Sequence, residues 1–179
     1  MVKKILILSD SHGRSENIRL AIVKEKPDML IHLGDIEDDP ERVRKWLGLA
    51  VPAVFVQGNC DRYGGYDLQK SAVFELNGHK FFCAHGHMQG VNYGLQNLMY
   101  TAMENGCDIA MYGHTHVPYD EEFPGPETAD SETGEKEKSI RILNPGSISL
   151  PRGGNRRTYM IMTFDSEGGF IVKLKKLFV

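Results

Sequence analysis

Residues 2–13 of this chain read VKKILILSDSHG. The run from Val2 to Leu8 is largely apolar and β-branched and is broken only by two lysines, which predicts a buried strand. Ser9 and Asp10 follow this run directly, and His12 comes two residues after Asp10. Ligands of an open α/β sheet bind just beyond the carboxyl ends of its strands. The first strand therefore predicts a polar site at its end.

The pattern of the first strand recurs further along the chain. Two short apolar runs, at 29–33 and 53–56, each lead to a glycine followed by a polar residue, which is Asp35 in one case and Asn59 in the other. Helices are predicted between these strands, with Ser15 and Asp39 as their N-caps. The order β-α-β-α-β predicts a mainly parallel α/β sheet with right-handed crossovers.

The second half of the chain predicts a hairpin, a helix and further strands. Asn77-Gly78 between two apolar runs is typical of a type I′ hairpin. Apolar residues at helical spacing predict a helix that Asn92 caps and Gly106 ends. The other predicted strands are 109–112, 139–143, 158–164 and 170–177, with the last two antiparallel to each other.

An acidic segment interrupts this pattern between Asp120 and Ser139. It holds eight acidic residues and two lysines, so its net charge is 2 − 8 = −6, and it is rich in proline and glycine. This composition predicts a flexible, solvated loop at 120–139. There is no internal repeat, and we expect residues 1–179 to form a single domain.

The overall composition excludes several classes of protein. Of the 179 residues, 41% are hydrophobic and 25% are charged, and the formal net charge is −3. There is no overall basic character, so nucleic-acid binding is not indicated. No apolar run reaches the length of a membrane span. Three cysteines without a CxxC pattern predict reduced thiols and a cytoplasmic protein, and a homo-oligomer is left open.

Seven nitrogen- and oxygen-donor side chains follow the predicted strands or the hairpin. Side chains of these types suit Mn, Fe, Zn, Ni or Co ions. Two divalent cations would leave the site electropositive, because its carboxylates supply only two negative charges, and such a site suits a phosphate oxyanion. The seven candidate ligands are Asp10, His12, Asp35, Asn59, His85, His114 and His116.

Five short motifs in this order resemble those of the calcineurin-like metallophosphoesterases. They are Asp10-x-His12-Gly, Gly34-Asp35, Gly58-Asn59-x-Asp61, His85-Gly86 and Gly113-His114-Thr-His116. The sequences Gly58-Asn59-Cys60-Asp61 and Asn144-Pro-Gly-Ser147 are similar to those of the small bacterial and archaeal phosphodiesterases of the family. The resemblance covers about residues 2–178. It implies a four-layer α/β/β/α sandwich of two mixed β-sheets.

The resemblance also implies a role for each candidate ligand. Three residues (Asp10, His12 and His116) would hold one metal and three (Asn59, His85 and His114) the other. Asp35 would bridge the two ions. A hydroxide bridging the metals would attack the phosphorus of a small molecule that contains a phosphodiester. We expect manganese first, with nickel, cobalt, iron or zinc as alternatives.

The candidate catalytic residues are Asn59, His85, His87 and Cys60. The family commonly has a histidine that helps to protonate the leaving group where this chain has Cys60, and a thiol is a poorer proton donor. His87 would orient a ligand or touch the phosphate. The alternative function is a non-catalytic protein-binding scaffold on the same fold, which the loss of a ligand would favour.

Other polar residues have structural interpretations. We expect His32 either to be packed in the core or to lie behind the metal ligands, His79 to be exposed and Asp61 to brace the metal loop. The sequence Asn144-Pro-Gly-Ser147 predicts a turn. Arg152 is expected either to contact a substrate phosphate or to form a surface ion pair.

Overall fold

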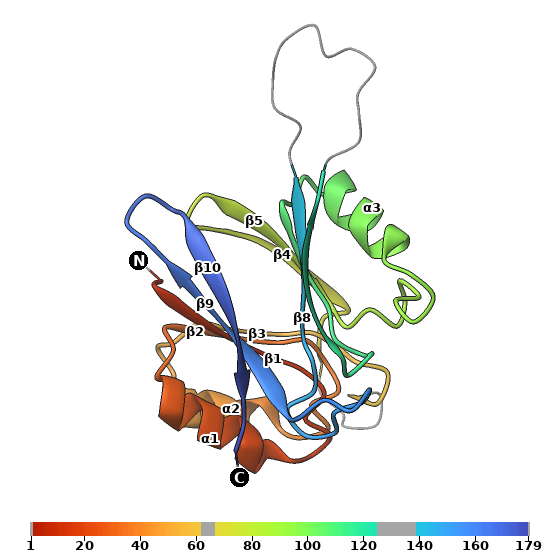
Figure 1. The fold of residues 1–179 in the computed structure, drawn as a ribbon. Coiled ribbons are helices and arrows are strands. Elements are labelled where there is room, and N and C mark those ends of the chain that lie inside the picture. Colours follow the sequence, from red (N-terminus) through yellow and green to blue (C-terminus); the bar gives the residue numbers. More distant parts are fainter. Residues whose placement is uncertain (1, 62–66, 125–138, 179) are drawn as a thin grey trace, which may run out of the picture.

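Two five-stranded mixed sheets lie face to face in the computed structural model, which describes residues 2–61, 67–124 and 139–178 (Figure 1). The strand order of the first sheet is β10-β9-β1-β2-β3 and that of the second is β4-β5-β6-β8-β7. The first sheet consists of β1 (Lys4–Leu8), β2 (Met29–His32), β3 (Ala53–Phe55), β9 (Thr158–Phe164) and β10 (Phe170–Lys176). The second consists of β4 (Ser71–Leu76), β5 (His79–Ala84), β6 (Ile109–Met111), β7 (Pro118–Phe123) and β8 (Ile140–Pro145).

Among the described residues, three helices cover the outer faces of the sheets. The helices α1 (Ser15–Glu25) and α2 (Pro40–Leu47) lie on the first sheet, and α3 (Gln96–Glu104) lies on the second (Figure 1). Alternate residues of β1 show how the sequence specifies these layers. Ile5 and Ile7 pack in the core between the sheets, whereas Leu6 and Leu8 pack in the core beneath α1 and α2. A third apolar core lies under α3, so the expected four-layer sandwich is confirmed.

Parallel pairing sets the position of the loops. β1, β2 and β3 are parallel neighbours in the first sheet, and β5, β6 and β8 are parallel neighbours in the second. Parallel neighbours end at the same edge of their sheet. Polar residues that follow strands of one sheet therefore gather at one edge, and packing of the two sheets brings the two edges together.

The strand β7 was not predicted from the sequence. Residues 120–123, which were expected to begin the acidic loop, belong to this strand and pair antiparallel with β8. β7 is an edge strand with mostly exposed side chains, so it lacks the apolar alternation of a buried strand. Arg141 on β8 donates to both carboxylate oxygens of Asp120 and helps to fix the pair. The remainder of the expected loop, residues 125–138, lies outside the described residues.

Two of the three predicted helix caps are wrong. Ser15 is the first helical residue of α1 and follows Arg14, and no side chain caps that helix. Asn92 lies before α3 without capping it, because Leu95 occupies the N-cap position. Asp39 does cap α2, where its carboxylate accepts from the backbone N–H of Glu41 at 2.9 Å.

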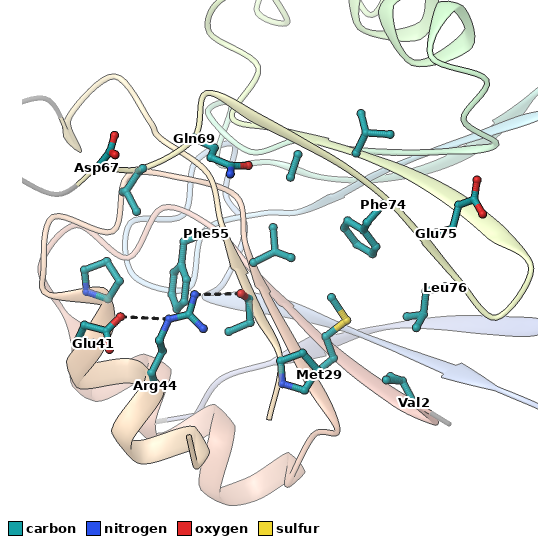
Figure 2. Close-up of a pocket in the computed structure, with 17 residues that line it drawn as sticks. Val2, Met29, Glu41, Arg44, Phe55, Asp67, Gln69, Phe74, Glu75 and Leu76 are labelled. Atoms are coloured by element: carbon teal, nitrogen blue, oxygen red, sulfur yellow. Dashed lines mark hydrogen bonds and ion pairs between the residues drawn. The ribbon is translucent and has the colours of Figure 1, made fainter. Parts of the chain in front are cut away.

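A cavity of about 750 Å³ opens between the edge strands β3 and β4 (Figure 2). Apolar side chains such as Phe55 and Phe74 line much of it. Arg44 crosses its wall, pairs with Glu41 and donates to the carbonyl of Ala53. None of the candidate ligands lines this cavity. Within the described ranges, no helix is long and apolar enough to cross a membrane.

Candidate metal centre

Five of the seven candidate ligands have an unusual backbone conformation. Residues with a side chain rarely adopt a positive φ, and such residues concentrate at functional sites. Here the φ values lie in the left-handed region. The residues that adopt them follow the ends of β1, β2 and β6 closely. These residues are Asp10 (55°), His12 (46°), Asp35 (52°), His114 (66°) and His116 (60°).

Two glycines allow the loops to approach one another. A Cβ added at Gly58 would overlap the carboxylate of Asp35, and one added at Gly113 would overlap the hydroxyl of Ser9. The absence of a Cβ at these two positions therefore permits the close contact between the loops.

Three histidines are oriented by oxygen atoms behind their rings. Nδ1 of His85 donates to the carbonyl of Leu33 at 2.7 Å, and Nδ1 of His116 donates to the carbonyl of Leu150 at 2.6 Å. Nδ1 of His12 contacts the carboxylate of Glu37 in the same way. In a neutral imidazole, a proton on Nδ1 leaves a lone pair on Nε2. Each of the three Nε2 atoms can therefore act as a ligand.

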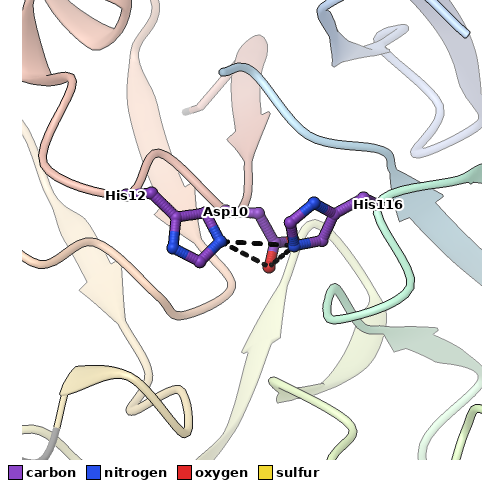
Figure 3. A group of neighbouring side chains, drawn as sticks. All are labelled: Asp10, His12 and His116. Atoms are coloured by element: carbon purple, nitrogen blue, oxygen red, sulfur yellow. Dashed lines mark hydrogen bonds and ion pairs between the residues drawn. The ribbon is translucent and has the colours of Figure 1, made fainter. Parts of the chain in front are cut away.

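The Nε2 atoms converge with the carboxylate of Asp10 (Figure 3). Nε2 of His12 lies 3.3 Å from Nε2 of His116, which in turn lies 3.1 Å from Oδ1 of Asp10. Metal–nitrogen distances of 2.0–2.1 Å place two ligand atoms about 3.0–3.4 Å apart in octahedral or tetrahedral geometry. The fully buried Oδ1 of Asp10 has no hydrogen-bond partner among the described residues. A cation would satisfy this oxygen and both imidazoles, so the residues fit a divalent metal.

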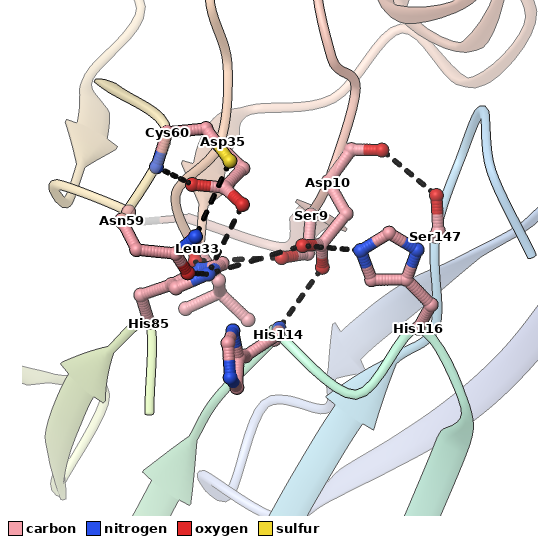
Figure 4. A network of polar contacts seen from close by, with 12 residues as sticks. Ser9, Asp10, Leu33, Asp35, Asn59, Cys60, His85, His114, His116 and Ser147 are labelled. Atoms are coloured by element: carbon pink, nitrogen blue, oxygen red, sulfur yellow. Dashed lines mark hydrogen bonds and ion pairs between the residues drawn. The ribbon is translucent and has the colours of Figure 1, made fainter. Parts of the chain in front are cut away.

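Asp35 lies beside a second group of ligand atoms (Figure 4). Its Oδ2 is 3.4 Å from Nε2 of His85 and 3.8 Å from Nε2 of His12. Oδ1 of Asn59 is 3.2 Å from the same Nε2 of His85. Asp35 thus stands between the His12 side and the His85 side of the centre, as a bridging ligand would.

His114 is held differently from the other candidate ligands. Its backbone N–H donates to Oδ2 of Asp10 at 3.1 Å, and its ring centroid lies 5.1 Å from that of His85. Its Nε2 lies 2.9 Å from the side-chain amide of Asn92, so Nδ1 is the ring nitrogen that remains to bind a metal ion. His114 is not one of the side chains in the three compact groups of candidate ligand atoms that the described residues form.

The pKa values report the negative charge of the centre. Burial alone would raise the pKa of Asp35, but the hydrogen bond and charge of His85 outweigh burial and lower it. Burial likewise opposes protonation of His85 and His116, yet the neighbouring carboxylates raise the pKa of both.

Buried hydrogen bonds brace the loops that carry these residues. Asp61 accepts from the backbone N–H groups of Asp35 at 2.8 Å, Glu37 at 2.9 Å and Gly58 at 2.7 Å. The expectation that Asp61 braces the loop is confirmed. The sequence Asn144-Pro-Gly-Ser147 was expected to be a turn, but Asn144 and Pro145 belong to the end of β8. The hydroxyl of Ser147 donates to the carbonyl of Asp10 at 2.8 Å, so this segment also supports the site.

Cys60 lies against two candidate ligands. Its backbone N–H donates to Oδ1 of Asp35 at 2.8 Å, and its Sγ accepts from the side-chain amide of Asn59 at 3.2 Å. Burial and the carboxylate of Asp35 raise the pKa of the thiol to about 12. His87 lies beside the centre, with its ring centroid 5.4 Å from that of His85 and 6.1 Å from that of His114.

Two other histidines are not candidate ligands. His32 is fully buried, contacts the hydroxyl of Ser11 at 3.0 Å and has its pKa lowered to about 4 mainly by burial, so its expected place in the core is confirmed. The expected exposure of His79 is wrong, because its ring lies between the carboxylate of Asp108 and the carbonyl of Gly168. The side chain of Arg152 is exposed, and its backbone N–H donates to the carbonyl of His116.

Sequence reasoning missed Glu37 and Asn92 as parts of the site. Glu37 follows Asp35 by two residues, and this proximity was the available signal. Asn92 had been interpreted only as a helix cap. Neither contact could be read from a local pattern, because each joins residues from different loops.

Comparison with known proteins identifies the family of the chain. Residues 4–167 match the family model of the calcineurin-like phosphoesterase superfamily domain. The probable metallophosphoesterase YsnB of Bacillus subtilis is 30% identical over 93% of this chain and 88% of its own length. Phosphodiesterase YfcE of Escherichia coli is 27% identical over 90% and 88%, respectively. The crystal structure of a predicted phosphoesterase from Streptococcus pneumoniae superposes with a TM-score of 0.74 at 31% identity, covering 98% of this chain and 90% of the other. The chain therefore belongs to the calcineurin-like phosphoesterase superfamily.

Proposed function

We propose that the chain is a cytoplasmic phosphodiesterase with a centre for two divalent metals. The observation that carries the proposal is the set of three imidazoles whose Nδ1 atoms are held by oxygen acceptors. Their Nε2 atoms converge on the buried Oδ1 of Asp10 and the carboxylate of Asp35. The name of the Escherichia coli relative supports a diester as the substrate.

The residues divide between two metal positions. Asp10, His12 and His116 form one compact group and would hold the first ion. Asn59, His85 and His114 would hold the second, and Asp35 would bridge them. When bound, two divalent cations supply Lewis acidity and a hydroxide nucleophile at neutral pH. We expect manganese, with nickel, cobalt, iron or zinc as alternatives, because every donor in this set is nitrogen or oxygen.

The chain's own groups set the remaining chemistry. The Asp61 carboxylate keeps Asp35 in its left-handed conformation through the backbone N–H of Asp35. Cys60 stands where the family commonly has a histidine that helps to protonate the leaving group, and its raised pKa of about 12 makes it a poor acid for this step at neutral pH. His87, beside His85 and His114, is positioned to contact a phosphate oxygen or to orient a ligand. Efficient turnover is therefore expected for diesters whose leaving group needs no proton.

The test uses two substrates with the same leaving group. Metal-free protein is reconstituted with Mn, Ni, Co, Zn or Mg and assayed on bis(4-nitrophenyl) phosphate and on 4-nitrophenyl phosphate. We expect metal-dependent turnover that favours the diester, is abolished by a chelator and is lost in His116→Ala. His79→Ala is the matched control, because this histidine lies apart from the candidate ligands.

Two results would overturn the proposal. One is full activity in excess chelator with no metal found by elemental analysis. The other is tight binding of two metals without turnover of any diester, which would favour the alternative of a non-catalytic protein-binding scaffold.

A further inference from the structure

The structure brings a thiol into the candidate metal centre. A ring nitrogen of His12, a carboxylate oxygen of Asp35 and Sγ of Cys60 all lie within 4.8 Å of one another. The other two compact groups in the described ranges contain only histidine and aspartate. Cys60 directly follows Asn59, and its Sγ accepts a hydrogen bond from the side-chain amide of Asn59 (Figure 4).

The geometry is close to that of a bound ion. For three atoms no more than 4.8 Å apart, some point lies within about 2.8 Å of all three. Zinc requires about 2.3 Å to sulfur and about 2.0–2.2 Å to nitrogen and oxygen. Side-chain shifts of about 0.5–0.8 Å would close this gap. His12 and Cys60 are both partly exposed, so an ion and a solvent ligand can reach the position.

The charge of the group also suits one divalent cation. A bound cation favours the thiolate against the raised pKa of the free thiol, so Cys60 would then contribute one negative charge and Asp35 another, while a ligating imidazole adds none. Binding would release the thiol proton to solvent as the metal–sulfur bond forms. Thiolate ligands favour soft ions, whereas carboxylate and imidazole groups also hold manganese.

We propose that His12, Asp35 and Cys60 form a third, thiol-containing cation position that takes cadmium, an ion softer than the metals expected to support hydrolysis. An ion at this position uses His12, which also belongs to the group with Asp10 and His116, so the two positions exclude one another. The inference rests on the proposed function only through these shared residues. A soft cation at the thiol position would displace the manganese centre and inhibit the enzyme.

Cobalt spectroscopy tests the thiol directly. Metal-free protein titrated with Co²⁺ should develop a near-ultraviolet sulfur-to-cobalt charge-transfer band, and Cys60→Ser should lack it. Cys107→Ala, at a buried cysteine under α3, is the matched control and should keep the band. By calorimetry, Cys60→Ser should bind Cd²⁺ at least about tenfold more weakly and Mn²⁺ unchanged, because sulfur is a poor ligand for manganese.

Cadmium-113 NMR of the unmutated protein provides a test that needs no variant. A resonance shifted far downfield, as sulfur coordination produces, would support the position. A resonance typical of nitrogen and oxygen ligands alone, or identical cobalt spectra for the parent and Cys60→Ser, would overturn it. A protein that lacks esterase activity yet shows the sulfur signals would refute the proposed function and leave this inference standing.

Discussion

Removing the carboxylate of Asp61 should weaken both the fold and the metal centre. This side chain is almost fully buried and accepts three backbone hydrogen bonds, from Asp35, Glu37 and Gly58. Hydrogen bonds to a charged group contribute about 1.5–3 kcal/mol each. After partial replacement by water, we expect Asp61→Ala to cost about 4 kcal/mol. For a chain of this size, this corresponds to a fall in Tm of roughly 8–16 °C.

Asp61→Asn is the subtler change. One amide oxygen can replace Oδ2 and keep the bonds from Asp35 and Gly58, but the NH₂ group would then face the N–H of Glu37. One bond is lost and two donors oppose each other, which should cost about 2 kcal/mol. Because Glu37 also contacts Nδ1 of His12, we expect manganese affinity to fall about 10–100-fold.

The assay is thermal melting combined with calorimetric titration of manganese. Asp28→Asn is the matched control, because Asp28 also accepts backbone N–H bonds, from Lys3 and Lys4, and lies at the opposite ends of the strands. It should leave manganese affinity unchanged. If Asp61→Asn loses stability but keeps parental manganese affinity, the link from Asp61 to the metal loops is refuted. If neither quantity changes, the structural role is refuted as well.

Four further outcomes are expected. Asp35→Asn should reduce metal affinity and turnover more than any other single ligand change, because it weakens the bridge to both ions; a fully active variant with two bound metals would contradict the bridging role. His79→Ala should lower stability by about 1–2 kcal/mol without changing turnover, because it removes the contacts with Asp108 and Gly168; an unchanged melting curve would count against those contacts. Replacing residues 125–138 by a short turn should preserve the cooperative melting transition, because Phe123 already pairs with Ile140; insoluble protein would be the opposite result. Cys60→His should help alkyl leaving groups selectively, since a missing general acid costs about 10²–10⁴-fold; a flat parental plot of log rate against leaving-group pKa would show that another group already serves as the acid.

Local patterns in the sequence predicted most of the framework. Apolar runs indicated nine of the ten strands, and Asn77-Gly78 indicated the hairpin between β4 and β5. Asp39-Pro40 indicated the start of α2. These signals are carried by neighbouring residues, so no tertiary information is needed to read them. The resemblance to a known family then predicted that the strands form two sheets in a four-layer sandwich.

The predicted set of polar side chains at strand ends was likewise readable from sequence. Each candidate ligand follows a strand or hairpin closely, and the parallel strands of each sheet end at the same edge. The strand order of the chain thus indicated which residues would meet. The strand order could not indicate which ring nitrogen of a histidine faces the centre. That choice depends on the group that accepts from Nδ1, and this group comes from another loop, as the carbonyl of Leu33 does for His85.

The tertiary structure alone decided the features that depend on contacts between distant segments. Nε2 of His12 meets Nε2 of His116 across 104 positions of sequence, because each lies in a left-handed turn at the joined edge of the two sheets. The edge strand β7 forms because β8 offers a partner, although its own side chains are mostly exposed. His79 is half-buried because Asp108 and Gly168, from two other loops, close around it. The sequence determined the kinds of ligand and the order in which they occur, whereas packing of one sheet on the other determined their distances and orientations.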